Sequence, residues 1–114
     1  MRIESKSDYK MYLSADLDAL NIKPSLKNKL THDIWSFQKS LRKLEYYLNC
    51  KHGLLSRVYT VLLRLRVRKK GRKLGFSIPP NAFGPGLSIA HAGTIVVNAN
   101  ARIGRNCRIH VCVN

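Results

Sequence analysis

The sequence predicts an α+β protein in two parts: an α-helical domain at residues 1–74, followed by a parallel β-helix of about two coils at residues 75–114. Two observations lead to this prediction. Apolar residues recur with helical spacing in the first part of the chain, and a six-residue repeat runs from Pro79 to Asn114. The expected β-helix is incomplete at its C-terminal end, because the repeats stop after about two coils.

The six repeats read PPNAFG, PGLSIA, HAGTIV, VNANAR, IGRNCR and IHVCVN. The fifth position of every hexad is apolar, and so is the first position of the last three. Two apolar positions two residues apart on each short strand, with Gly and Asn at the corners, are typical of a parallel β-helix. We expect the inward side chains to be Phe83, Ile89, Ile95, Val97, Ala101, Ile103, Cys107, Ile109 and Val113.

Three helices are predicted near residues 8–20, 33–49 and 54–70. Each carries an apolar stripe, which we interpret as its core-facing side. Gly71 and Gly75 are expected to end the third helix, with the first strand at residues 76–78. The three stripes, in chain order, are Tyr12, Leu13, Leu17 and Leu20; Ile34, Phe37, Leu41, Leu44 and Leu48; and Leu54, Val58, Leu62 and Leu65.

Charge is distributed very unevenly along the chain. The net charge is +15, all six acids lie in the first 45 residues, and seven of the ten residues from Arg64 to Lys73 are basic. Such a patch can bind nucleic acid, anionic lipid or another polyanion. No helix-turn-helix, RNA-binding or zinc motif accompanies it, so we expect no sequence-specific binding of nucleic acid.

Cysteine spacing and hydropathy indicate the environment of the protein. Cys50, Cys107 and Cys112 fit no zinc spacing, and His110 with Cys112 supplies too few ligands, so we expect no metal. The chain has no apolar run of ~18 residues, which a transmembrane helix requires. Its first residues lack the apolar core of a secretory signal. We therefore expect a reduced, cytoplasmic protein.

His91 occupies a hexad position where Val or Ile would be expected, within the string SIAHAGTIVV at residues 88–97. Together with LGFSIPPN (74–81), FGPGL (83–87) and ARIG (101–104), this string resembles the catalytic coil of serine acetyltransferases in the hexapeptide-repeat acyltransferase superfamily. The likeness is to the short forms of surface-polysaccharide gene clusters. It covers nearly the whole chain and is strongest from Leu74 to Asn114. The resemblance implies that the β-helix is left-handed and that the protein forms a homotrimer with active sites at the subunit seams.

The same resemblance implies transfer of an acetyl group from acetyl-CoA to the hydroxyl of L-serine, which gives O-acetylserine for cysteine biosynthesis. His91 is then the general base, because an alcohol needs one at neutral pH and the histidine pKa suits that task. Residues that bind serine and acetyl-CoA are left unassigned. In the family much of the acetyl-CoA groove is formed by later coils, so we expect this chain to be a fragment or a truncated product.

Two alternatives stay open. The first keeps the acetyl transfer but changes the acceptor to a sugar hydroxyl. The second is a non-enzymatic basic module that binds polyanions through residues 64–73.

Ala90 stands where the long forms carry Asp, and no acid follows Glu45. The group that orients the imidazole is therefore an acid of the helical domain, an acid of another subunit, or a backbone carbonyl. His32 and His52 receive no catalytic role.

Overall fold

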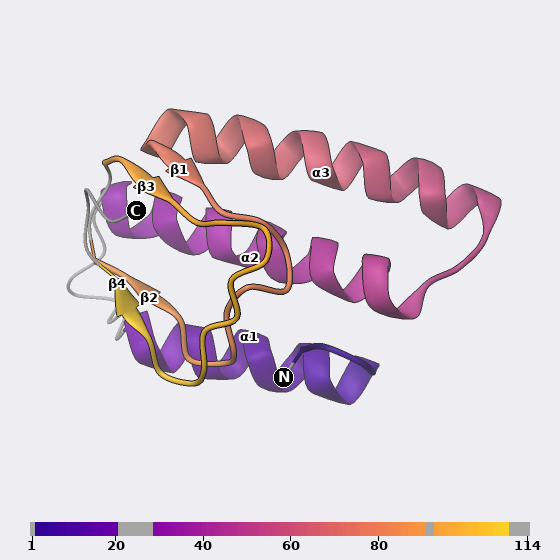
Figure 1. Cartoon of the computed structure of the whole chain (residues 1–114), viewed down its shortest axis with the longest axis horizontal. Helices are drawn as coiled ribbons and strands as arrows, with labels where there is room; N and C mark the ends of the chain where they lie inside the picture. The colour runs from indigo at the N-terminus through magenta and orange to yellow at the C-terminus, as the bar shows by residue number, and fades with distance from the viewer. Residues whose placement is uncertain (1, 21–28, 91–92, 110–114) are drawn as a thin grey trace.

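In the described part of the chain, three helices lie side by side and contain most of the residues (Figure 1). The computed structural model describes residues 2–20, 29–90 and 93–109. Helix α1 spans Lys6–Leu20, α2 spans Lys29–Cys50 and α3 spans Leu54–Leu74. Helix α2 packs against both α1 and α3. The three predicted helices are confirmed, although α3 continues through Gly71.

Local sequence explains two of the helix ends. At the start of α1 the Ser5 hydroxyl accepts a hydrogen bond from the Asp8 N–H, and the Asp8 carboxylate accepts one from the Glu4 N–H, both at 3.0 Å. This reciprocal arrangement is close to a capping box. At the end of α3, Gly75 adopts the left-handed conformation with φ 89° and donates its N–H to the carbonyls of Gly71 and Arg72.

The described residues after α3 form four strands of two residues each: β1 (Phe76–Ser77), β2 (Ser88–Ile89), β3 (Ile95–Val96) and β4 (Arg108–Ile109). They make two separate parallel pairs, β1 with β3 and β2 with β4. An isolated parallel bridge joins Phe83 to Ile103. Partners in these pairs are 19 or 20 residues apart in sequence.

The prediction of a left-handed parallel β-helix of about two coils is wrong. The described residues contain two two-stranded parallel sheets, and no β-helix coils are evident among them. The physical reason lies in the core. Apolar side chains of the hexads pack with helix residues such as Phe37, Leu41 and Leu63 in a single hydrophobic cluster. A β-helix instead fills its interior with its own side chains. The observed fold is a helix-rich α+β arrangement.

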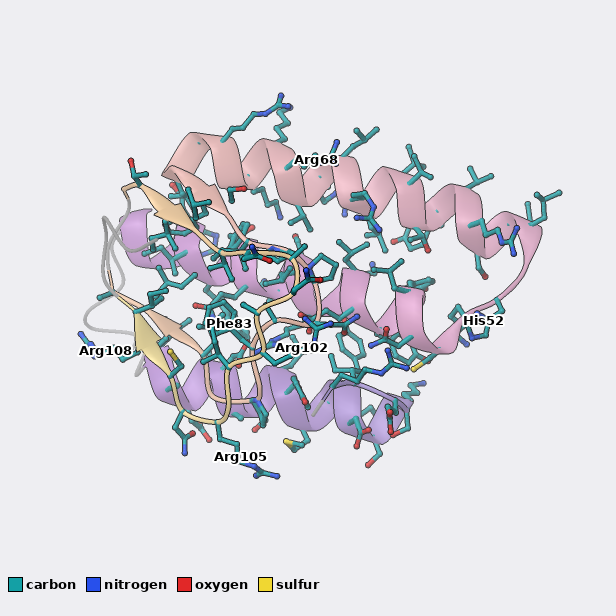
Figure 2. All side chains as sticks on the ribbon, viewed as in Figure 1. His52, Arg68, Phe83, Arg102, Arg105 and Arg108 are labelled. Atoms are coloured by element: carbon teal, nitrogen blue, oxygen red, sulfur yellow. The ribbon has the colours of Figure 1, made fainter. Side chains whose placement is uncertain are left out.

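The expected inward hexad positions are nevertheless buried or half-buried where the structure describes them, although residues 82–89 are buried without interruption and show no alternation. Four of the expected inward residues are buried, namely Phe83, Ile89, Ile95 and Ile109. Val97, Ala101, Ile103 and Cys107 are half-buried, and Val113 lies outside the described residues. Arg102 and Arg105 are exposed, and Figure 2 shows Arg105 projecting away from the ribbon.

Two of the predicted core-facing stripes need correction. On α1, Tyr12 and Asp16 are buried while Leu17 is exposed. On α3 the predicted face of Leu54, Val58, Leu62 and Leu65 is exposed. The face that enters the core is formed by Leu63, Val67, Gly71 and Leu74.

Among the described helices, none combines the length and the apolar character that crossing a bilayer requires.

At Gly71, α3 packs tightly against the segment that follows it. A Cβ at this position would lie 2.7 Å from the Phe76 carbonyl oxygen and 3.3 Å from a ring carbon of Phe37. Alanine normally stabilises a helix interior by about 1 kcal/mol relative to glycine. Here overpacking against backbone outweighs that gain, so we expect Gly71→Ala to lower the free energy of unfolding by about 1–3 kcal/mol, measured by urea denaturation.

Gly104→Ala is the matched control, because a Cβ there would meet no atom within 4 Å. We expect it to change the free energy of unfolding by no more than about 0.5 kcal/mol. A Gly71→Ala protein as stable as the parent would contradict the tight contact between α3 and Phe76.

Candidate functional site

The predicted catalytic residue, His91, lies outside the described residues, as do Ala92, His110 and Cys112. The described residues on either side of this segment are anchored. The Ala90 N–H donates to the Ile109 carbonyl at 3.0 Å, and the Gly93 N–H donates to the Leu74 carbonyl at 2.7 Å. The described chain therefore stops just after strand β2 and resumes at Gly93, beside the end of α3.

A buried network of charged and polar side chains lies beneath the segment that leads to His91. We call it the buried polar network; it consists of Asp16 from α1 and of Gln38, Arg42 and Glu45 from α2, each at most 1% exposed. Arg42 binds Asp16 with two hydrogen bonds, from Nε to Oδ2 at 2.7 Å and from Nη2 to Oδ1 at 3.1 Å. Its Nη1 donates to Oε1 of Glu45 at 2.9 Å.

The network also holds the backbone of the first two hexads. The Arg42 guanidinium donates to the carbonyl oxygens of Phe83 and Gly84, at 2.9 and 2.8 Å. The Glu45 carboxylate accepts the Asn81 N–H at 2.9 Å. Each N–H of a fully buried guanidinium needs an acceptor, and these carbonyls complete the set that the two carboxylates begin.

Asp16 and Gln38 bind the backbone of the residues that follow, as far as strand β2. Oδ1 of Asp16 accepts the N–H groups of Gly86 and Leu87, both at 3.0 Å. The Gln38 amide donates to the Leu87 carbonyl at 3.0 Å and accepts the Ile89 N–H at 3.3 Å. Side chains of two helices thereby fix the backbone of residues 86–89.

Burial and ion pairing act in opposite directions on the charged members. Burial lowers the pKa of Arg42, but Glu45 and Asp16 outweigh this effect and leave that pKa above its usual range. Burial raises the pKa of Glu45, while the Arg42 guanidinium and the Asn81 N–H oppose the rise. Arg42 therefore stays charged. Because the two acids are engaged with it, the network acts as a positioning device rather than as a reactive centre.

Two cavities adjoin the segment that follows α3. The smaller, about 80 Å³, is lined by residues that include Leu20, Ser88, Arg108 and Ala90, the last described residue before His91. The larger, about 460 Å³, lies between α3 and residues 76–80 and 97–99. Within the described ranges, no group of three His, Cys, Asp or Glu side chains is placed to hold a metal ion.

Three arginines spaced one turn apart on α3, Arg64, Arg68 and Arg72, line the larger cavity. All six acids of the chain belong to the described residues, yet none lies within salt-bridge distance of these arginines. Guanidinium groups without carboxylate partners are suited to bind phosphate, with which they form paired hydrogen bonds. The cavity can therefore accept an anionic group of a ligand.

Sequence reasoning missed the buried polar network. It assigned Asp16 and Arg42 no role, because acids and arginines are usually exposed. A signal was nevertheless present: Gln38, Arg42 and Glu45 recur at intervals of four and three residues, directly beside the apolar stripe of α2. The backbone carbonyls that complete the network leave no such mark in the sequence.

Comparison of the chain with protein-family models, with curated proteins and with solved structures gives no match. The function must therefore be inferred from the geometry of the site and from the sequence itself.

Gln38 offers a direct test of how firmly residues 87–89 are held. In Gln38→Met the Leu87 carbonyl and the Ile89 N–H lose their buried partner, which we expect to cost about 1–3 kcal/mol of unfolding free energy. Amide hydrogen exchange at Ile89 should accelerate beyond what the global loss explains. Lys39→Met, at the exposed neighbouring position, is the control and should change neither quantity. Unchanged exchange at Ile89 in Gln38→Met would show that the network does not hold β2.

Proposed function

We propose that this chain is an acetyl-CoA-dependent O-acetyltransferase, or the N-terminal part of one, that acts on L-serine, with His91 as the general base. The main support for the proposal is that the motif around His91 coincides with backbone that the buried polar network holds in place. The string GPGLSIAHAGTIV at residues 84–96 is the part of the chain that resembles serine acetyltransferases. The half that precedes His91 is the part that the buried polar network binds.

A fixed backbone is what a catalytic base needs. Proton transfer requires the imidazole within hydrogen-bond reach of the acceptor hydroxyl, and small displacements cost large factors in rate. Residues immediately before His91 are held at Leu87, Ile89 and Ala90, and the first described residue after it is held at Gly93. This anchoring supports a role for His91 that depends on position.

In the proposed reaction His91 removes the proton from the serine hydroxyl while the hydroxyl oxygen attacks the thioester carbonyl of acetyl-CoA. A backbone N–H stabilises the negative charge that develops on the carbonyl oxygen. The C–S bond then breaks, and the proton held by the imidazole passes to the departing thiolate. The products are O-acetylserine and CoA.

The buried polar network limits which groups can orient the imidazole of His91. Asp16 and Glu45, the buried acids, are both ion-paired to Arg42. We therefore assign the orienting role to a backbone carbonyl, to an exposed acid of the helices or to another subunit. Assembly as a homotrimer in the cytoplasm belongs to the same proposal and rests on the resemblance alone.

The arginine-lined cavity supports acetyl-CoA as the acyl donor. The cofactor carries three phosphate groups at a distance from its thioester, and these need cationic partners. Arg64, Arg68 and Arg72 offer such partners beside residues 76–80. A sugar as acceptor would leave this part of the proposal unchanged, because the donor is the same.

The proposal is tested by following thiol release from acetyl-CoA by the full-length protein. We expect release to depend on L-serine. Release that depends instead on a hexose or an N-acetylhexosamine would identify the sugar alternative. If no acceptor promotes release and the protein does not bind acetyl-CoA in calorimetry, the proposed function is wrong.

A further inference from the structure

Helix α3 carries a second apolar face, on the side opposite the core. We call it the outer stripe; its six large apolar residues are between 55% and 86% exposed: Leu54, Leu55, Val58, Val61, Leu62 and Leu65. They follow helical spacing and so form one continuous surface over three turns. Figure 2 shows side chains projecting from the outward side of α3, away from α2.

Single exposed apolar residues are common on protein surfaces, but a continuous stripe of six marks a surface that binds something. The other large apolar residues that are exposed in the described part of the chain, Met11, Leu17 and Val96, are only about 40% exposed and lie on other elements. The outer stripe therefore stands apart from the rest of the surface.

The charge of α3 limits which partners the outer stripe can bind. The helix contains eight basic residues and no acid. Arg57, Arg66 and Lys69 are exposed on the same helix. Among the described residues, Lys73 is the one α3 cation within salt-bridge distance of a carboxylate, that of Asp33 at 3.8 Å. A partner must therefore offer both an apolar phase and negative charge.

We propose that the outer face of α3 docks onto an anionic lipid bilayer, with the helix lying parallel to the surface. The acyl-chain boundary would receive the outer stripe, and the anionic headgroups would receive the arginines and lysines of the same helix, most of which lie at residues 64–73, as for other interfacial amphipathic helices. This inference does not depend on acetyl transfer.

Charge complementarity favours a bilayer over two other partners. A second copy of α3 would bring another eight cations against the first eight, which opposes association. Nucleic acid supplies the negative charge, but a groove lined with phosphates gives Leu55 and Leu62 no apolar surface to enter. An anionic bilayer satisfies both requirements.

The test is sedimentation of the protein with sucrose-loaded vesicles of phosphatidylcholine, with and without about 30% phosphatidylserine. We expect binding to the anionic vesicles to be at least about tenfold tighter than to the neutral ones. Leu55→Ser/Leu62→Ser should weaken that binding about tenfold or more, because the apolar part of the contact is removed while the charge is kept. Circular dichroism checks that the variant is folded; both residues are exposed, so we expect it to be.

Met11→Ser/Leu17→Ser is the matched control, since it removes two exposed apolar residues from α1 and should leave vesicle binding unchanged. Three results would overturn the proposal. The first is no binding to anionic vesicles. The second is binding that the serine substitutions on α3 do not weaken, which would indicate plain polyanion binding through the cations. The third is an oligomer in light scattering that Leu55→Ser/Leu62→Ser dissociates, which would show that a second copy covers the outer stripe.

Discussion

Replacing Arg42 with methionine is expected to lower the free energy of unfolding by about 3–5 kcal/mol, the range for removal of one member of a buried ion pair. The guanidinium is fully buried and binds both Asp16 and Glu45. Methionine fills similar space but leaves two carboxylates without their cation and the carbonyls of Phe83 and Gly84 without their donor. Since small domains have only about 5–15 kcal/mol of stability, this loss should be plain in urea denaturation.

The control for Arg42→Met is Arg2→Met, which removes an arginine–carboxylate pair from the surface. Arg2 lies 3.5 Å from the Glu4 carboxylate and both side chains are more than half exposed, so at most about 1 kcal/mol should be lost. If Arg42→Met were no more destabilising than Arg2→Met, the buried polar network would contribute little to the fold. An intermediate value together with a changed m-value would instead indicate that the two-state treatment fails.

Replacing His91 with alanine is expected to reduce serine-dependent release of CoA by about 10²–10⁴-fold in the full-length protein, as loss of a general base typically does. The effect should fall on kcat more than on KM, because the base acts in the transition state. Steady-state assays with acetyl-CoA and L-serine measure both parameters, and circular dichroism confirms that the variant is folded.

The other histidines provide the comparison. His52 is exposed in the connection between α2 and α3 (Figure 2), and His32 is exposed on α2, so alanine at either position should leave turnover nearly unchanged. His110→Ala should cost much less than His91→Ala, because it does not match the base of the resembled family. A folded His91→Ala enzyme with normal turnover would remove His91 from the mechanism.

The helices could be predicted from the sequence because their signal is local. The stripe of α2 repeats at intervals of three and four residues, and it is buried as expected at Ile34, Phe37, Leu41 and Leu44. The orientation of α3 could not be predicted in the same way. That helix has apolar residues on two opposite sides, and the choice between them depends on packing against Phe37 and Phe76.

The hexads illustrate the same limit. The apolar positions of the repeat correctly identified buried residues such as Phe83 and Ile95. Whether the strands form a β-helix or pack against other elements depends on contacts with helices that are distant in the sequence. The repeat carries no information on those contacts. The prediction of His91 as the base stays a prediction. The buried polar network escaped notice because charged side chains are usually exposed and because several of its partners are backbone groups.

The separation of the network's members along the chain bears on the order in which the protein folds. Asp16 and Arg42 are 26 residues apart, and Asp16 and Leu87 are 71 apart, whereas the bonds within each helix are local. Closing long segments costs chain entropy before any contact forms, so we expect the helices to form first and the network to form after the main barrier. Interactions absent from the transition state slow unfolding without speeding folding. The buried charges would then set the lifetime of the native state, and a weakened network would shorten that lifetime while leaving the rate of folding unchanged.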